Sequence, residues 1–233
     1  FDEFVDDQTF CTADRIYLKW HKDDANYCRE VYSYDLFRRF GVWSAPRACY
    51  TRLSVFVEGD DKPVYMGVYA LIEGMKDSYL RSRVEAGKYT TEDGFLWKAS
   101  YGANLSPNTM TDNNMGVEVA ALNPSESETY MYDLKTKKKK LTEAREQLKS
   151  FVNDMNILKS GSAELKAYLE ARVDVDLFLR AYAVNVAVGM WDDYWCNMNN
   201  YYFYFDGDKF IFIPFDYDNT LGTSNVMENS GTH

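Results

Sequence analysis

Carboxylates and amides that could bind a divalent metal ion are concentrated near the end of the chain. A first group follows Trp191, and a second begins about two dozen residues later: Asp192, Asp193, Asn197, Asn199 and Asn200, then Asp216 and Asp218. Such oxygen ligands suit Mg²⁺ or Mn²⁺, which prefer carboxylates, amides and phosphate oxygens to His or Cys. Phosphoryl transfer uses a set of this kind, because one Asp orients the acceptor hydroxyl while an Asn and a second Asp hold the metal.

The elements between the two groups would bring them together. Residues 174–189 are apolar almost all round, which predicts a buried central helix that ends at the first pair of carboxylates. Strands expected at 201–205 and 209–214 are joined by Asp206-Gly207-Asp208, a hairpin turn that folds the second pair back toward the first. The same Asp and Asn residues could equally cap the turns around this hairpin and serve structure alone.

Alternation and periodicity predict the other elements. These are a strand at 15–20, a helix from Asp23 or Asp24 to about Phe40, strands at 49–58 and 64–73, a helix at 141–159 and another from about Ala163. Thr142 is expected to cap the helix at 141–159. Residues 87–128 are polar, with a strand-like island at 94–98, and are expected to form an excursion between two parts of the fold.

Composition excludes several classes of function. The net charge of −10 over 233 residues would repel a nucleic-acid backbone. Four cysteines lack metal-ligand spacing and only two histidines occur, so a structural zinc site and Ser-His-Asp chemistry have almost no candidates. The apolar stretch at 174–189 contains Arg180 and Asn185 and is too short for a membrane span. Because the chain does not begin with Met, we expect it to be a piece of a longer protein, truncated at both ends.

Four blocks of the sequence resemble the CotH-type protein kinases, an atypical kinase-like family known from spore coats. The last block combines WDDYWCNMNNYYFY with IPFDYDNTLG, which are similar to the family's WD.Y-like helix end, its Asn before a YYLY-like strand and its IPWD.D.T.G-like element. The blocks upstream are YDLFRRFGVWSAPRACYTRLSVFVEG, MGVYALIEGMKDSYLRSR and GFLWK. They occur in the family's order from about Leu18 to Gly222, which is nearly the whole chain.

The resemblance implies a role for each residue that matches the last block. Asp193 would orient the acceptor hydroxyl or accept its proton. Its neighbour Asp192 could be mistaken for it, but the family pattern and the spacing to Asp216 favour Asp193. Asp216 would be the metal-binding carboxylate, with Asn200 as a second ligand and Asp218 as a weaker candidate.

Nucleotide-contacting residues are implied in the same way. Lys19 would pair with the phosphates and Glu30 on the next helix would be its partner, while Lys98 is the rival lysine. Either lysine could also be an ordinary surface residue. Glu73, at the end of a strand before a helix, resembles a hinge position whose backbone meets adenine. Phe210 stands where the family often has Trp and could pack on the base, or it could be a core aromatic.

The implied fold is α+β and protein-kinase-like, with two lobes. Residues 1–85 would form a small lobe of antiparallel strands plus one helix, and residues 86–233 a mainly helical large lobe with the catalytic hairpin and an insert at 87–140. The implied activity is transfer of the γ-phosphate of ATP to Ser or Thr of a protein substrate, with Mg²⁺ or Mn²⁺. We expect a secreted or cell-surface protein, with a spore-coat protein as the alternative. The glycine-rich phosphate loop of ordinary kinases is not visible.

Other functions fit parts of the sequence. FIPFDYDNTLGTS closely resembles the first motif of haloacid-dehalogenase phosphatases, in which Asp216 would be phosphorylated and Asp218 would act as acid and base. That motif normally opens its fold, whereas only 11 residues follow Gly222 here. A non-enzymatic alternative is an inactive kinase-like surface or adhesion module, or a domain stabilised by Ca²⁺ at the DYDN loop. A Ca²⁺ site would bind its ion without nucleotide, whereas the Mg²⁺ of a kinase should bind tightly only with ATP.

Overall fold

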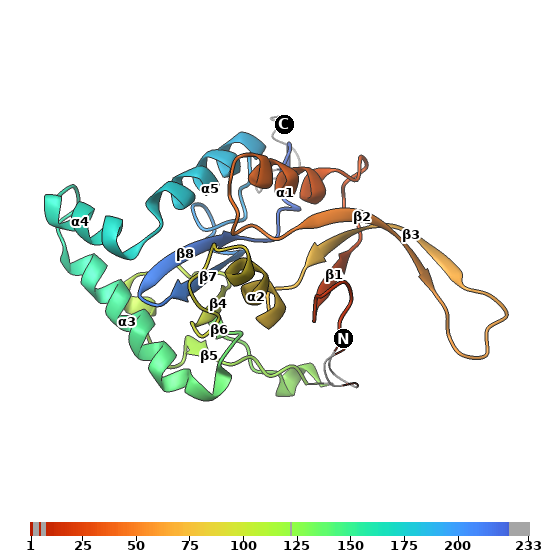
Figure 1. Ribbon diagram of the computed structural model, residues 1–233, viewed down its shortest axis with the longest axis horizontal. Coiled ribbons are helices and arrows are strands. Elements are labelled where there is room, and N and C mark those ends of the chain that lie inside the picture. Colours follow the sequence, from red (N-terminus) through yellow and green to blue (C-terminus); the bar gives the residue numbers. More distant parts are fainter. Residues whose placement is uncertain (2–4, 6–7, 122, 224–233) are drawn as a thin grey trace.

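Two β-sheets and five α-helices make up an α+β fold, counted over the residues that the computed structural model describes, 1, 5, 8–121 and 123–223. The first sheet is antiparallel, with the strand order β1 (Ile16–Lys19), β3 (Val64–Glu73) and β2 (Ala48–Val55). The second has the order β5 (Met115–Gly116), β6 (Tyr132–Leu134), β4 (Leu96–Ala99), β7 (Tyr201–Asp206) and β8 (Lys209–Pro214). Figure 1 shows β2 and β3 continuing past β1 as a ribbon that projects from the body.

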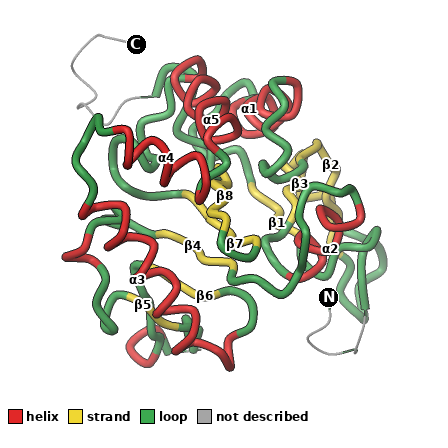
Figure 2. The backbone as a smooth tube through the Cα atoms, turned by 60° about the vertical axis from the view of Figure 1, so that its left-hand side comes forward, coloured by secondary structure: helices red, strands yellow, loops and turns green. Residues whose placement is uncertain are grey.

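The helices surround the second sheet and link it to the first. They are α1 (Arg29–Arg39), α2 (Asp77–Glu85), α3 (Leu141–Ile157), α4 (Ala163–Arg172) and α5 (Val175–Val188), with short 3₁₀ turns at Pro107–Thr109, Pro124–Glu126 and Lys138–Lys140. α1 and α5 run side by side (Figure 1), and Figure 2 shows α3 passing along the second sheet near β5 and β6. None of the helices in the described part of the chain is long and apolar enough to cross a membrane.

Helix α1 buries one face and thereby points an acidic side chain into the protein. Glu30, Tyr34 and Phe37 are buried at a spacing of four and three residues, which is one stripe of an α-helix. The helix begins later than the sequence predicted. The Asp24 carboxylate accepts the backbone N–H of Arg29 at 2.8 Å, so residues 24–28 form a turn rather than a first helical turn.

The hairpin of β7 and β8 lies in the core of the second sheet, as its continuous run of apolar and aromatic residues requires. All five residues from 201 to 205 are buried, because β4 and β8 flank β7 and helices cover the sheet. α5 differs from the prediction of a helix buried on every side. Its residues Leu179, Tyr182 and Val186 are exposed, because only one face of the helix packs on α1 and β8.

Residues 87–140, expected to form an insert, contribute three strands to the second sheet. β4 lies at the centre of the sheet, where its Trp97 is opposite Phe203 of β7. The part after residue 86 therefore combines a five-stranded sheet with α3, α4 and α5, and the sheet was not part of the prediction of a mainly helical part. Thr142 is also not the cap of α3, whose N-cap residue is Lys140 without a side-chain hydrogen bond.

Candidate active site

One lysine joins three segments that are far apart in the sequence. The ammonium of Lys19, at the end of β1, lies 3.0 Å from Glu30 Oε2 of α1 and 3.2 Å from Asp218 Oδ2, which follows β8. It also donates a hydrogen bond to Asp216 Oδ1. Burial lowers the pKa of Lys19, but the charges of these three carboxylates outweigh burial and hold the pKa well above its ordinary value.

The carboxylates around Lys19 carry more negative charge than one ammonium can balance. Burial raises the pKa of Glu30 to about 7, although its contact with Lys19 acts in the opposite direction. Burial and then the charge of Asp216 raise the pKa of Asp218. Glu30 is 5% exposed, and its Oε1 has no hydrogen-bond partner among the described residues. This excess of carboxylate charge, with Glu30 buried, favours the binding of a further cation.

Asp192 is the acceptor at the centre of a ring of asparagine side chains. Four amide groups donate to its two oxygens, at 2.9 Å from Asn197, 3.2 Å from Asn199, 2.9 Å from Asn200 and 3.4 Å from Asn219. The charge of Asp192 also contributes to the raised pKa of Asp218, so the ring belongs to the same electrostatic cluster as Lys19. Asp192 is half-buried and is held in one orientation at the edge of that cluster.

Asp193 points into the interior instead. It is 2% exposed, its Oδ1 accepts the backbone N–H of Cys196 at 3.0 Å, and burial raises its pKa. Its charge acts on buried Tyr217, whose hydroxyl donates to Asn185 of α5. The carboxylate therefore supports the loop after α5, and its Oδ2 is buried without a hydrogen-bond partner among the described residues. The choice of Asp193 over Asp192 therefore stays a prediction.

Two residues of the site have a backbone conformation that non-glycine residues adopt rarely. The φ angles of Asn200 and Asp216 are 51° and 63°, in the left-handed region. Such conformations cost free energy and persist only where surrounding contacts maintain them, and they are common at functional sites. The backbone of Asn200 follows the loop after α5, and that of Asp216 follows β8, so both ends of the hairpin carry this feature.

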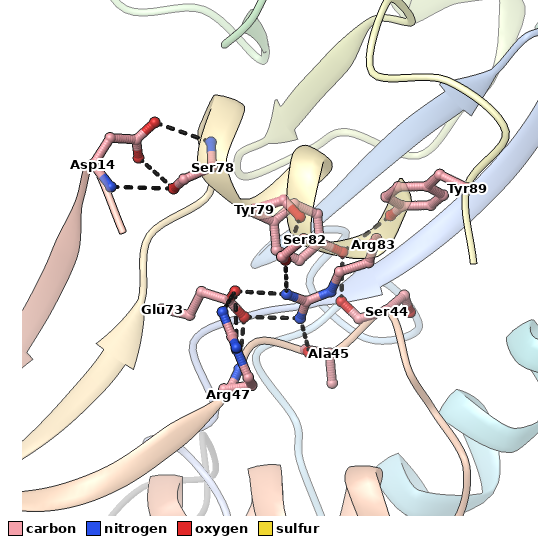
Figure 3. Close-up of polar contacts among 10 residues, drawn as sticks. All are labelled: Asp14, Ser44, Ala45, Arg47, Glu73, Ser78, Tyr79, Ser82, Arg83 and Tyr89. Carbon is pink, nitrogen blue, oxygen red and sulfur yellow. Dashed lines mark hydrogen bonds and ion pairs between the residues drawn. The ribbon is translucent and has the colours of Figure 1, made fainter. Parts of the chain in front are cut away.

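The backbone N–H of Glu73, one of the groups that a hinge contact with adenine could use, is already paired. Its N–H donates to the carbonyl of Arg47 at 2.9 Å. Its carboxylate forms a buried ion pair with Arg83 of α2, at 2.5 Å, and a second one with Arg47, at 2.6 Å (Figure 3). Burial raises the pKa of Glu73, but the hydrogen bonds and charge of Arg83 outweigh burial and bring it below its ordinary value. Glu73 is thus a structural link between β3 and α2.

The other two nucleotide candidates lie on strands of the second sheet. Lys98 is half-buried on β4, opposite Tyr202 of β7 and Asp133 of β6. Phe210 is in the aromatic core, where its ring stacks on Phe151 with centroids 5.0 Å apart. Of the lysines that the sequence proposed, Lys19 is therefore the one beside Asp216, and Phe210 is a core residue.

The oxygen donors near Lys19 fit a hard divalent cation, but they are not arranged around one. In the described part of the chain, no group of three His, Cys, Asp or Glu side chains is arranged around a metal position while Lys19 is in place. The Lys19 ammonium stands between Asp216 and Asp218 in the position of a cation. Asn200 directs its amide nitrogen to Asp192, so its amide oxygen is the atom that could bind a metal. Carboxylate and amide oxygens are the donors that Mg²⁺ and Mn²⁺ take.

An α+β fold with a lysine held between a helical glutamate and two aspartates after a hairpin is the class of site expected for a kinase. Comparison with protein families agrees, since residues 1–232 match the family described as CotH kinase protein. The chain belongs to this family, and the match covers essentially its whole length. A comparison with curated proteins gave no match. Membership of the family indicates a kinase-like function.

Proposed function

We propose that the protein is an ATP- and divalent-metal-dependent kinase that transfers the γ-phosphate to Ser or Thr of a protein substrate. The observation that carries the proposal is the Lys19 ammonium, shared by Glu30 of α1 and by Asp216 and Asp218 after β8. In this proposal the first sheet with α1 is the small lobe, and the second sheet with α3, α4 and α5 is the large lobe.

Nucleotide binding would redistribute the contacts of Lys19. The lysine keeps Glu30 as its partner and exchanges Asp216 for phosphate oxygens, to which it is a point charge with three donors. Asp216, Asp218 and the amide oxygen of Asn200 are the residues that would hold Mg²⁺ or Mn²⁺. When bound, the metal would neutralise phosphate charge.

The carboxylate that orients the acceptor hydroxyl is, in this proposal, Asp192 rather than Asp193. Four asparagine amides hold Asp192 in place, and it is half-buried, so its oxygens are fixed before a substrate arrives. Phosphoryl transfer depends mainly on such positioning and on charge neutralisation, with little covalent work for the protein. Because four donors fill the roughly four acceptor sites of a carboxylate, the substrate hydroxyl would replace the longest of these bonds, the 3.4 Å bond from Asn219.

Calorimetry of ATP binding tests the proposal, with Mg²⁺, with Mn²⁺ and with EDTA, on the wild-type protein and on Asp216→Asn. We expect binding that needs the metal and that is lost in the variant. Asp176→Asn is the matched control, because Asp176 lies on the exposed face of α5, where it pairs with Arg180 at 2.7 Å. Transfer of labelled phosphate to Ser- and Thr-containing peptides then tests the acceptor. Absence of ATP binding by the folded protein would refute the kinase proposal.

A second candidate function, a kinase-like binding module without catalysis, is favoured by the projecting β2–β3 ribbon. Large apolar side chains are exposed along it: Val55, Phe56, Val57, Val64, Tyr65 and Met66. Exposed apolar residues in such density mark interaction sites on soluble proteins. The calorimetry separates the two functions, because a folded protein that does not bind ATP with Mg²⁺, with Mn²⁺ or with EDTA would be a binding module and not a kinase.

A further inference from the structure

Asp216 is held by its backbone as well as by its side chain. Its N–H donates a hydrogen bond to the hydroxyl of Tyr34, with the two atoms 2.9 Å apart. Tyr34 lies on α1 and is 2% exposed, so water does not compete for this bond. The φ angle of Asp216 is 63°, a conformation that the surrounding contacts must maintain.

The same helix also supplies the partner of Lys19. Glu30 and Tyr34 are four residues apart on α1, and side chains at this spacing lie on the same face of a helix. Glu30 contacts the Lys19 ammonium at 3.0 Å, while Tyr34 contacts the backbone of the residue that receives a hydrogen bond from that ammonium. One face of α1 therefore sets both sides of the Lys19–Asp216 contact.

The residues after Asp216 are fixed by packing that does not involve the Tyr34 hydroxyl. The Tyr217 ring meets Phe37 edge to face at 4.7 Å, and its hydroxyl donates to Asn185 at 2.9 Å. The N–H of Leu221 donates to the carbonyl of Val188 on α5. Removal of the Tyr34 hydroxyl alone should therefore leave the loop in place and release only the peptide unit of Asp216.

We infer that Tyr34 is a positioning residue for the metal-binding carboxylate. Its hydroxyl keeps Asp216 in the left-handed conformation that directs the carboxylate toward Lys19, and α1 thereby couples the lysine to the metal ligand. A shift of α1 would move the partner of Lys19 and the backbone anchor of Asp216 together. The inference rests on the proposed function for the identity of the ligand, but the hydrogen bond itself can be tested without any ligand.

The test is Tyr34→Phe, which keeps the buried ring and removes the hydroxyl. In the protein without nucleotide, hydrogen exchange of the Asp216 amide followed by NMR should become faster, because its acceptor is gone. In calorimetry, binding of ATP with Mg²⁺ should weaken about tenfold, since a buried donor without a partner disfavours the binding conformation. In EDTA neither the wild-type protein nor the variant should bind ATP, because the proposed binding needs the metal.

Tyr79→Phe is the control for loss of a buried hydroxyl elsewhere, since Tyr79 on α2 donates to Ser44 and lies away from Asp216. Unchanged exchange and unchanged metal-dependent affinity in Tyr34→Phe would overturn the inference. An equal weakening of ATP binding with Mg²⁺ in Tyr79→Phe would also overturn it, because that result indicates general loosening. If the wild-type protein does not bind ATP, the proposed function fails, and the exchange rate still decides the role of Tyr34.

Discussion

Replacement of Asp192 by asparagine should slow phosphate transfer far more than the same replacement of its neighbour Asp193. Asp192→Asn removes the negative charge that would orient the substrate hydroxyl. It also turns one carboxylate oxygen into an N–H₂ group that faces the asparagine donors. Loss of a group that accepts a proton or orients a hydroxyl lowers turnover by about 10²- to 10⁴-fold. This corresponds to about 3–5 kcal/mol in the activation free energy.

Asp193→Asn should instead change turnover by less than about tenfold. The asparagine oxygen can still accept the N–H of Cys196, and a buried carboxyl whose pKa is already raised loses little when it becomes neutral. Burial of Asp193 at 2% exposure also keeps it from the acceptor hydroxyl.

The assay is single-turnover transfer of labelled γ-phosphate to a library of Ser and Thr peptides, with saturating ATP and Mg²⁺. Thermal unfolding and ATP affinity of both variants are measured beside it, so that a misfolded protein is not scored as inactive. Full transfer by Asp192→Asn together with loss of transfer by Asp193→Asn would refute the reasoning from burial and restore the assignment that the family pattern favoured.

Three further results are expected from the ion pairs. Because burial raises the folded-state pKa of Glu30 from 4.5 to about 7, the native protein binds more protons than the unfolded chain between these values. The free energy of unfolding should therefore fall by about 3 kcal/mol as the pH rises through this window. Denaturant unfolding of Glu30→Gln should show a smaller fall. An equal fall in the two proteins would contradict the raised pKa of Glu30. Lys19→Met should let Glu30, Asp216 and Asp218 bind Mn²⁺ without nucleotide, because the ammonium no longer occupies the position of a cation. Equilibrium dialysis measures the Mn²⁺ affinity. An affinity equal to that of the wild type would contradict this idea. Arg83→Met should destabilise the fold by about 3–5 kcal/mol in urea unfolding, because it leaves the Glu73 carboxylate with a poorly compensated buried charge. Arg47→Met, whose side chain is 63% exposed, should cost clearly less, and equal costs would contradict this account.

The local elements around the site followed from the sequence. The Asp206-Gly207-Asp208 turn between two apolar runs predicted the hairpin of β7 and β8, and the strand predicted at 64–73 is β3 (Val64–Glu73). The order of the motif blocks indicated the CotH kinase family, and the family match over residues 1–232 confirmed it. These features depend on residues that are close together in the chain, so a short window of sequence contains the information.

The positions of single side chains depended on contacts between distant segments. Asp192 and Asp193 are adjacent residues of the same type. The packing of the loop after α5 decides that the Asp192 carboxylate lies beside the Lys19 cluster and that the Asp193 carboxylate is buried. Nothing in the sequence indicated that the Tyr34 hydroxyl accepts a hydrogen bond from the Asp216 N–H, because the two residues are 182 positions apart in the chain. The one local sign that could have pointed to Asp192 was the cluster of asparagines at 197, 199 and 200, whose amide groups need an acceptor nearby.

By itself the sequence determined the family, the secondary structure near the hairpin and the oxygen-rich chemistry of the site. Tertiary structure alone decided which lysine meets Asp216, because Lys19 and Lys98 are both strand residues and differ only in which sheet carries them. It also assigned Glu73 to a buried ion pair and Phe210 to the core. The physical reason is that propensity and periodicity act over a few residues, whereas burial and charge pairing are set by segments that meet only in the folded chain.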